Sequence, residues 1–250
     1  MISGYLEKLT ACQCLEDVWT LHQNKMSEYG FGRVMYGFTR YRNGASLGDQ
    51  DDLLLLSNHD TAYLDVFFGE KLYYNAPMVR WSLENEGACS WSWMADQIKA
   101  GTFTESELKV VDFNRSFDVT AGYTISFKSV SYRERGGIAL TGNPGVEQEE
   151  VDEIWAKHGQ DLLVMNNVAH LKLINMPWTG QRRPLTHRQR EVLEWVGEGK
   201  TMQDIACIMG LTPATVEKHL RLVRTALDVE TTAQAVRKAS VQKQIYLIDG

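Results

Sequence analysis

Three basic side chains recur on one predicted helix near the end of the chain. In the stretch TPATVEKHLRLVR, residues 212–224, they are Lys218, Arg221 and Arg224. Thr212 is suited to cap the start of a helix, and Pro213 suits its first turn, where no backbone donor is needed. An apolar stripe recurs at helical spacing: Val216, Leu220 and Val223. The stretch therefore predicts an amphipathic helix whose basic face can bind phosphates or the acceptor atoms of guanine.

Candidate catalytic residues are few. His59 and Asp60 are adjacent, but no activated serine or cysteine motif accompanies them. The glycine-rich stretch GGIALTGNPG lacks the spacing and the strand-to-helix setting of a phosphate-binding loop. The four cysteines lack the spacing of a zinc site. We therefore expect no enzyme activity, no metal site and no cofactor.

The charge of the chain is unevenly distributed. The formal net charge of all 250 residues is −6. Residues 179–250 hold 11 Lys and Arg against 8 Asp and Glu, a net +3, and the preceding residues hold 15 against 24, a net −9. Because local charge governs attraction to phosphates, a small basic module on an acidic body is compatible with binding double-stranded DNA.

The compartment is predicted from what the sequence lacks. No apolar run approaches the length of a membrane span, and the first ten residues, MISGYLEKLT, lack the apolar core of a signal peptide. Four cysteines are too few for a disulfide scaffold and fit a reducing compartment. We expect a soluble protein of the cytoplasm without membrane contact.

The best predicted domain boundary is the stretch NMPWTGQRRPLT, which contains two prolines, a glycine and paired arginines. We expect a first domain over 1–174, a linker over 175–184 and a second domain over 185–250.

The first domain is predicted to be α+β. Helices are expected at both ends, over 5–29 and 146–173. The runs between them are β-like at 32–39, 52–57, 122–132 and 136–142, and short helices are expected at 61–71, 76–87 and 105–118. This order predicts an antiparallel sheet with helices on both sides, an α-β-α sandwich.

The second domain is predicted to be all-helical, with four helices. Gly210 separates two of them, which is typical of a helix-turn-helix. Periodicity alone is equally compatible with a helical bundle that docks on a partner.

Residues 185–245 resemble the DNA-binding domain of the LuxR family of bacterial regulators. The resemblance rests on LTHRQREVLEW with Glu191, on GKTMQDIA, on TPATVEKHL with Thr215, Val216 and His219, and on AVRKA. It covers the whole module without a gap. It implies a four-helix domain whose third helix, the helix of the opening stretch, reads DNA.

The resemblance implies roles in DNA binding for seven residues, three of them by their position on that helix. Glu217, Lys218 and Arg221 are expected to face base edges, where arginine can pair with guanine. Contacts to the DNA backbone are expected from Lys200, Thr212, Thr215 and Arg224.

The first domain resembles, more weakly, the signal-binding domain of the same family, which holds acyl-homoserine lactones. Residues 58–79, NHDTAYLDVFFGEKLYYNAPMV, match that family's pocket segment without gaps, and CSWSW at 89–93 supplies a following tryptophan, Trp91. The resemblance implies six candidate ligand-binding residues: Tyr63, Phe67, Asn75, Ala76, Met78 and Trp91.

Three of these positions depart from the family pattern. The family has a tryptophan at Tyr63, a tyrosine at Phe67 and an aspartate at Ala76, and these side chains bind the two carbonyls and the amide N–H of the ligand. Phe67 has no donor and Ala76 has no acceptor. Asn75 can supply an acceptor only if the register of the helix start shifts by one residue.

Three interpretations of the pocket follow. It binds an acyl-homoserine lactone in altered geometry, it binds another small apolar signal, or its own side chains fill it. The sequence favours a sequence-specific regulator that acts independently of the standard signal, or on a different one.

The expected assembly is a homodimer on palindromic promoter sites, because one helix-turn-helix buries little surface and two-fold sites mirror two-fold proteins. The apolar faces of the first and the long helix are expected to contribute to the dimer. An anti-activator that acts by pairing with another regulator is the alternative, and the intact basic helix argues against it.

Overall fold

A computed structural model describes residues 2–44, 47–178 and 184–247 of the chain. The chain forms two compact units that divide between Ile174 and Asn175. Of the predicted linker, residues 179–183 lie outside the described part. None of the helices in the described residues has the length and apolar character needed to cross a membrane.

A five-stranded antiparallel sheet forms the centre of the first unit. Its strand order is β2-β1-β5-β4-β3. The strands are β1 Arg33–Thr39, β2 Leu54–Ser57, β3 Gly87–Ser90, β4 Gly122–Ser126 and β5 Arg135–Thr141. β1 and β5 are paired along their whole lengths.

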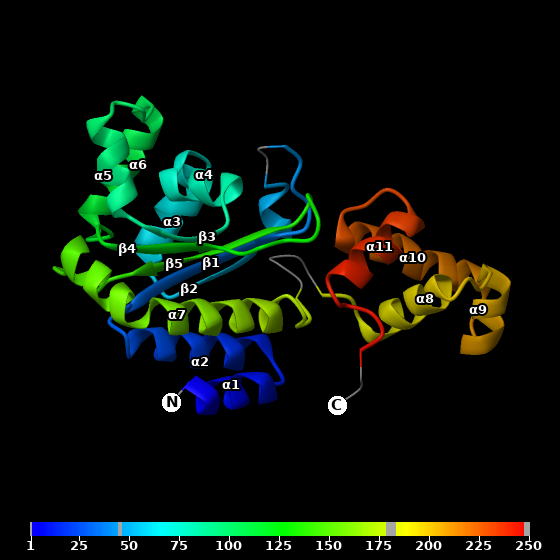
Figure 1. Cartoon of the computed structure of the whole chain (residues 1–250). Coiled ribbons are helices and arrows are strands. Elements are labelled where there is room, and N and C mark those ends of the chain that lie inside the picture. Colours follow the sequence, from blue (N-terminus) through cyan, green and yellow to red (C-terminus); the bar gives the residue numbers. More distant parts are fainter. Residues whose placement is uncertain (1, 45–46, 179–183, 248–250) are drawn as a thin grey trace. The chain divides into compact units, whose positions relative to one another are not determined.

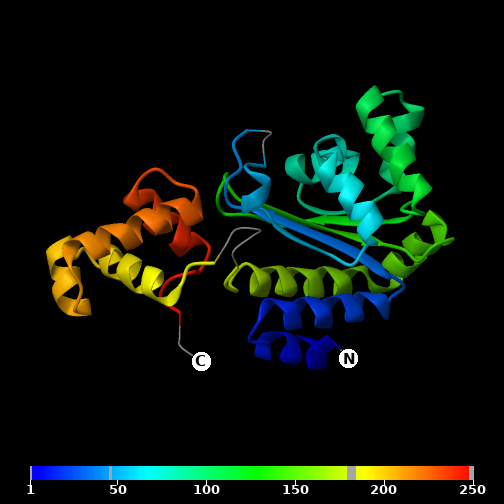
Figure 2. The ribbon, with the colours of Figure 1, turned by 180° about the vertical axis from the view of Figure 1, so that it is seen from behind.

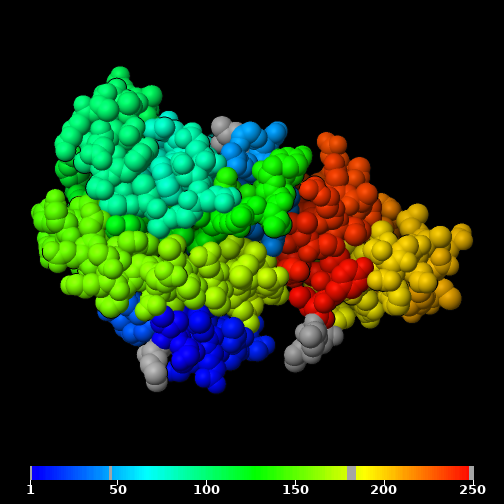
Figure 3. All heavy atoms as spheres, in the orientation of Figure 1, coloured from blue at the N-terminus to red at the C-terminus, as the bar shows by residue number. Residues whose placement is uncertain are grey.

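Three helices cover one face of this sheet. They are α1 Ile2–Ala11, α2 Leu15–Ser27 and α7 Gln148–Leu173. α7 lies directly on the sheet, and α2 and α1 follow beneath it (Figures 1 and 2). The space-filling view shows α7 as a continuous band between the first helices and the remainder of the unit (Figure 3).

The opposite face carries shorter helices (Figure 1). They are α3 Thr61–Gly69, α4 Pro77–Glu84, α5 Ser92–Lys99 and α6 Glu105–Ser116, with two 3₁₀ turns, η1 Gln50–Asp52 and η2 Leu72–Asn75. The predicted α-β-α sandwich with an antiparallel sheet is therefore confirmed.

Aromatic packing holds α7 on the sheet. The ring of His170 stacks on Phe127 at 4.1 Å between centroids, and Trp155 stacks on Tyr123 at 4.0 Å. The hydroxyl of Tyr36 lies 2.9 Å from His170 Nδ1. Burial of these apolar rings stabilises the layer contact, and the hydrogen bond satisfies polar atoms that are out of reach of water.

The single helix predicted over 5–29 is wrong, because the structure has two helices there. α1 ends at Ala11 and α2 begins after Cys14. The hydroxyl of Tyr5 lies 2.6 Å from His22 Nδ1. That contact requires the chain to turn back between the two helices, since residues 17 positions apart on one straight helix lie about 25 Å apart. β3 and α5 were not predicted, because their short sequences show neither clear alternation nor a long apolar stripe.

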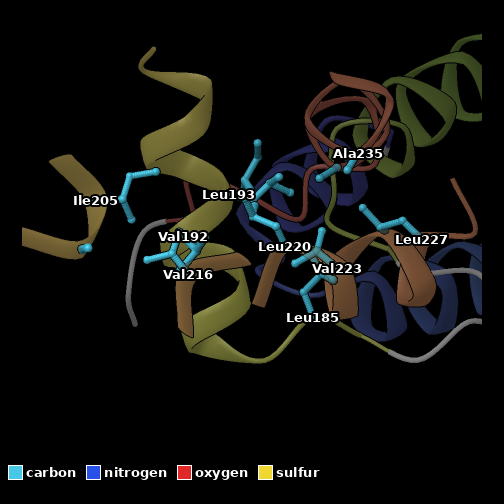
Figure 4. Close-up of a cluster of buried hydrophobic side chains, with 12 residues drawn as sticks. Leu185, Val192, Leu193, Ile205, Val216, Leu220, Val223, Leu227 and Ala235 are labelled. Atoms are coloured by element: carbon cyan, nitrogen blue, oxygen red, sulfur yellow. The ribbon is translucent and has the colours of Figure 1, made fainter. Parts of the chain in front are cut away.

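The second unit is all-helical, as predicted. Its helices are α8 His187–Gly197, α9 Met202–Met209, α10 Pro213–Leu227 and α11 Thr232–Val241. Each begins at a threonine whose side chain accepts a hydrogen bond from a backbone N–H in the first turn. Such caps contribute about 1 kcal/mol each. Apolar side chains from all four helices meet in one core (Figure 4).

Candidate functional site

The start of α10 is built by local hydrogen bonds. Thr212 Oγ1 accepts from the backbone N–H of Thr215 at 3.2 Å, and the two hydroxyls lie 2.9 Å apart. Pro213 occupies the first helical position. Gly210, with φ of 66°, ends α9 in the left-handed conformation that turns the chain. α9, this turn and α10 form the helix-turn-helix.

The buried stripe of α10 fixes which side faces outward. Val216, Leu220 and Val223 are at most 4% exposed and pack in the core (Figure 4). Lys218 and Arg221 are exposed. Neither forms an ion pair or side-chain hydrogen bond with any residue that the structure describes, so both cations are available to a polyanion.

Glu217 and Arg224 form an ion pair with each other. Arg224 Nη2 donates to Glu217 Oε1 at 2.9 Å, and Arg224 Nη1 donates to Thr232 Oγ1 at 3.0 Å. The carboxylate that lies next to the basic face is thus compensated by a cation of the same helix. Both residues were expected at the DNA.

The other predicted backbone contacts lie at helix starts. Lys200 is exposed immediately before α9, and Thr212 and Thr215 lie in the first turn of α10. The amino-terminal ends of helices favour anions, because unpaired N–H groups and the helix dipole point there.

The first unit contains a small cavity of about 80 Å³ between α3, α4 and the sheet. Five of the six predicted ligand-binding residues line it: Tyr63, Phe67, Ala76, Met78 and Trp91. The two segments that resemble the family's pocket, residues 58–79 and 89–93, therefore contribute side chains to the same cavity.

Two polar groups of this cavity, from Tyr63 and Trp91, bind other side chains of the protein. The Tyr63 hydroxyl donates to Asn114 Oδ1 at 2.9 Å, and Trp91 Nε1 donates to Thr124 Oγ1 at 2.9 Å. The ring of Tyr63 is stacked 5.3 Å from that of Phe67. Both of these donors are consequently already occupied.

Ala76 and Asn75 differ in exposure and in position relative to the cavity. Ala76 is 6% exposed, lines the cavity and precedes Pro77, the first residue of α4. Asn75 ends η2, is exposed and does not line the cavity. The structure does not bring Asn75 to the other candidates, since the register of α4 is fixed by the proline.

Three polar residues of the lining were not predicted as ligand-binding: His59, Asn114 and Thr141. The Thr141 hydroxyl is buried without a hydrogen-bond partner among the described residues. Burial, followed by the charge of Arg33, lowers the pKa of His59 to about 4, so this imidazole is neutral at pH 7. Strand alternation could have placed Thr141 on the cavity face, whereas Asn114 depends on the packing of α6.

A second cavity, of about 130 Å³, lies further along the same face of the sheet. Phe67 and Met78 line both cavities. The remaining wall of the second cavity is mainly apolar, and Arg135 is its one charged residue beside the hydroxyl-bearing Thr39, Tyr73, Ser82 and Thr124.

Comparison with known families matches both units of the chain. Residues 15–173 match the autoinducer binding domain, and residues 183–239 match the bacterial regulatory proteins of the luxR family. The chain belongs to the LuxR family.

Individual LuxR-family relatives are distant but extend over most of the chain. The transcriptional activator protein ExpR of Dickeya dadantii is 24% identical over 74% of this chain and 76% of its own length. The transcriptional activator protein LuxR of Aliivibrio fischeri is 22% identical, with 94% and 90% covered. The crystal structure of Escherichia coli SdiA has a TM-score of 0.55 at 16% identity and covers 98% of both chains.

These matches place the chain among LuxR-like quorum-sensing transcriptional regulators, which bind DNA and are not enzymes. α10 is the second helix of the helix-turn-helix in the part that matches the luxR family, and the cavities lie in the autoinducer-binding domain.

Proposed function

We propose that this LuxR-type regulator acts in the cytoplasm as a homodimer on palindromic DNA, and that it folds without an acyl-homoserine lactone. The observation that carries the second part is the pocket, where the Tyr63 hydroxyl and the Trp91 indole hydrogen-bond to Asn114 and Thr124 in place of a ligand.

The DNA part rests on α10. Lys218 and Arg221 project from it without internal partners among the described residues, and arginine and lysine are the side chains that pair with guanine most often. One small domain buries too little surface for tight specific binding, so we infer two copies on a two-fold site.

The proposal that the protein folds without an acyl-homoserine lactone rests on hydrogen-bond partners that the pocket lacks. Ala76 offers no acceptor to a ligand amide, and Phe67 offers no donor to its carbonyl. Each buried polar group left without a partner costs about 1–3 kcal/mol. Two such losses sum to about 2–6 kcal/mol, which weakens binding by about thirtyfold or more.

The volume of the pocket supports the same conclusion. The two cavities measure about 80 and 130 Å³, whereas sites for drug-sized ligands usually enclose about 300–1,000 Å³. The rings of His59, Phe67 and Phe113 stack on Tyr63 beside the smaller cavity. These side chains supply packing contacts that an empty pocket would lack.

Thermal melts of the purified full-length protein test the signal part. The protein should be obtained folded from cells that make no acyl-homoserine lactone, and lactones of graded chain length should leave the Tm unchanged. A ligand at a hundred times its Kd stabilises the folded state by about 2.7 kcal/mol. A Tm increase of several degrees with one chain length would show instead that the lactone binds in an altered geometry.

Binding to DNA separates the regulator from an anti-activator. The lactone-free protein should shift a palindromic promoter fragment at lower concentrations than it shifts an unrelated fragment. Equal binding to both fragments, or none, would favour an anti-activator that pairs with another regulator.

A further inference from the structure

The larger cavity has a floor made of residues with almost no side chain. Gly37 of β1 lies opposite Gly137 of β5, and Ala139 follows on the same face. Phe67 and Met78 form part of the roof. A dry cavity of roughly 150 Å³ holds a benzene molecule, so about 130 Å³ admits one six-membered ring or a chain of about six carbons.

Arg135 lies at the side of this cavity with unused donors. It is the first residue of β5, opposite Thr39. Its Nη2 donates to the carbonyl oxygen of Leu83 at 3.1 Å. Its Nε and Nη1 are buried and have no hydrogen-bond partner among the described residues. Buried donors are nearly always paired in native proteins. The two unpaired donors of this guanidinium therefore require a hydrogen-bond acceptor.

The charge of Arg135 also has no ion-pair partner among the described residues. Burial, and then the nearby charge of Arg42, lower the pKa of Arg135, while Glu86 acts in the opposite direction. No carboxylate of the described residues lies within ion-pairing distance of it. Arginine nevertheless keeps its charge in proteins. An anion placed here would gain a charge-assisted hydrogen bond and relieve the repulsion from Arg42.

We propose that the larger cavity binds a small apolar carboxylate, with the carboxylate on Arg135 and one ring or short chain over Gly37 and Gly137. This ligand would be the non-standard signal of the domain, and the inference rests on the proposed function to that extent. The polar end of such a ligand lies at Arg135, away from Ala76, which explains how the site dispenses with the family's aspartate.

Calorimetric titration of the full-length protein with matched probes tests the charge requirement. Benzoate and hexanoate are compared with benzamide and hexanamide, which have similar shapes but no charge. We expect the two acids to bind at least tenfold more tightly than the amides and to raise the Tm. Equal affinity of acid and amide, or no binding by any of the four, would overturn the proposal.

Two variants locate the site. Arg135→Gln should weaken binding of the acids at least tenfold and leave that of the amides unchanged. Arg133→Gln is the matched control, because Arg133 is exposed two residues away, and it should bind like the wild type. Unaltered binding of the acids by Arg135→Gln would contradict the assignment. Should that variant fail to fold, the comparison of acids with amides on the wild type still decides.

Binding to promoter DNA, measured without any probe, keeps the two proposals distinguishable. Specific DNA binding together with failure of the acids rejects only the carboxylate site. Absence of specific DNA binding rejects the proposed function, whatever the acids do.

Discussion

The carboxylate of Glu217 lies 2.9 Å from the guanidinium of Arg224, two turns further along the reader helix. The only acidic side chain of α10 is therefore neutralised within the helix, while Lys218 and Arg221 remain free among the described residues. The helix presents a net positive surface although its sequence mixes both signs.

Arg221→Ala is expected to cost about 1–3 kcal/mol of specific DNA binding and to relax the base preference at one position of each half-site. The reason is the loss of an arginine that can pair with guanine. Binding to a library of half-site variants measures both effects. Arg237→Ala, an exposed arginine of α11, is the control. An equal loss on all sequences would make Arg221 a phosphate contact.

Glu217→Gln is expected to strengthen binding to all DNA sequences. The change removes a negative charge and releases Arg224 for a phosphate, so the slope of log K against log salt should steepen by about 1. Stability should change by less than about 1 kcal/mol, because the carboxylate is half exposed and exposed ion pairs contribute little. Weaker binding at one base pair only would show that Glu217 contacts a cytosine amino group.

Ala76→Asp is expected to destabilise the first unit by about 1–3 kcal/mol, because it buries a carboxyl group in a cavity whose Tyr63 and Trp91 donors already bind other side chains. Urea unfolding measures the effect. Asn75→Asp is the matched control, since Asn75 is exposed, and it should stay within about 0.5 kcal/mol of the wild type. Similar losses at both positions would place Asn75 in the cavity.

Acidification is expected to destabilise the first unit through its buried histidines. Burial lowers the pKa of His22 and of His170 to about 4, below the ordinary 6.5. Between pH 4 and pH 6.5 the histidines of the unfolded chain bind protons that those of the folded chain do not. The contribution of the neutral histidines to stability is therefore fully present above about pH 6.5 and is lost as the pH falls towards 4. Each such group contributes a slope of about 1.4 kcal/mol per pH unit.

The unfolding free energy between pH 7 and pH 4.5 tests this expectation. His22→Gln should reduce the slope of unfolding free energy against pH by the contribution of one titrating group. His158→Gln, at an exposed position of α7, should leave this slope close to that of the wild type. A slope unchanged in His22→Gln would mean that His22 is already protonated in the folded protein.

The dimer is expected to involve α7. Val164 is 42% exposed on this helix, although α1 and α2 cover much of its apolar surface. Val164→Glu should shift sedimentation towards the monomer, and Leu108→Glu, at a similarly exposed position of α6, should not. A monomeric wild type at micromolar concentration, with and without DNA, would contradict the homodimer.

The sequence predicted the elements whose signals are local. Thr212 and Pro213 mark the start of the reader helix, and Val216, Leu220 and Val223 mark its buried side, so α10 was placed correctly. The split between α1 and α2 could not be predicted, because it depends on Tyr5 reaching His22.

In the pocket, the resemblance supplied the lining but not the hydrogen bonds. Tyr63 and Trp91 are paired with Asn114 and Thr124, which come from α6 and β4. No spacing along the chain predicts those pairs. The unused donors of Arg135 are likewise visible only once β5 and Leu83 are placed in space.

The glycine pair on the sheet floor gives the domain an adjustable ligand volume. A Cβ added at Gly37 would meet only the Cδ2 of Leu55, at an ordinary 3.6 Å. Exchange for alanine there would reduce the space by a methyl group without disturbing the strand pairing. Related chains with the same scaffold can thus evolve preferences for larger or smaller signals through one residue of β1.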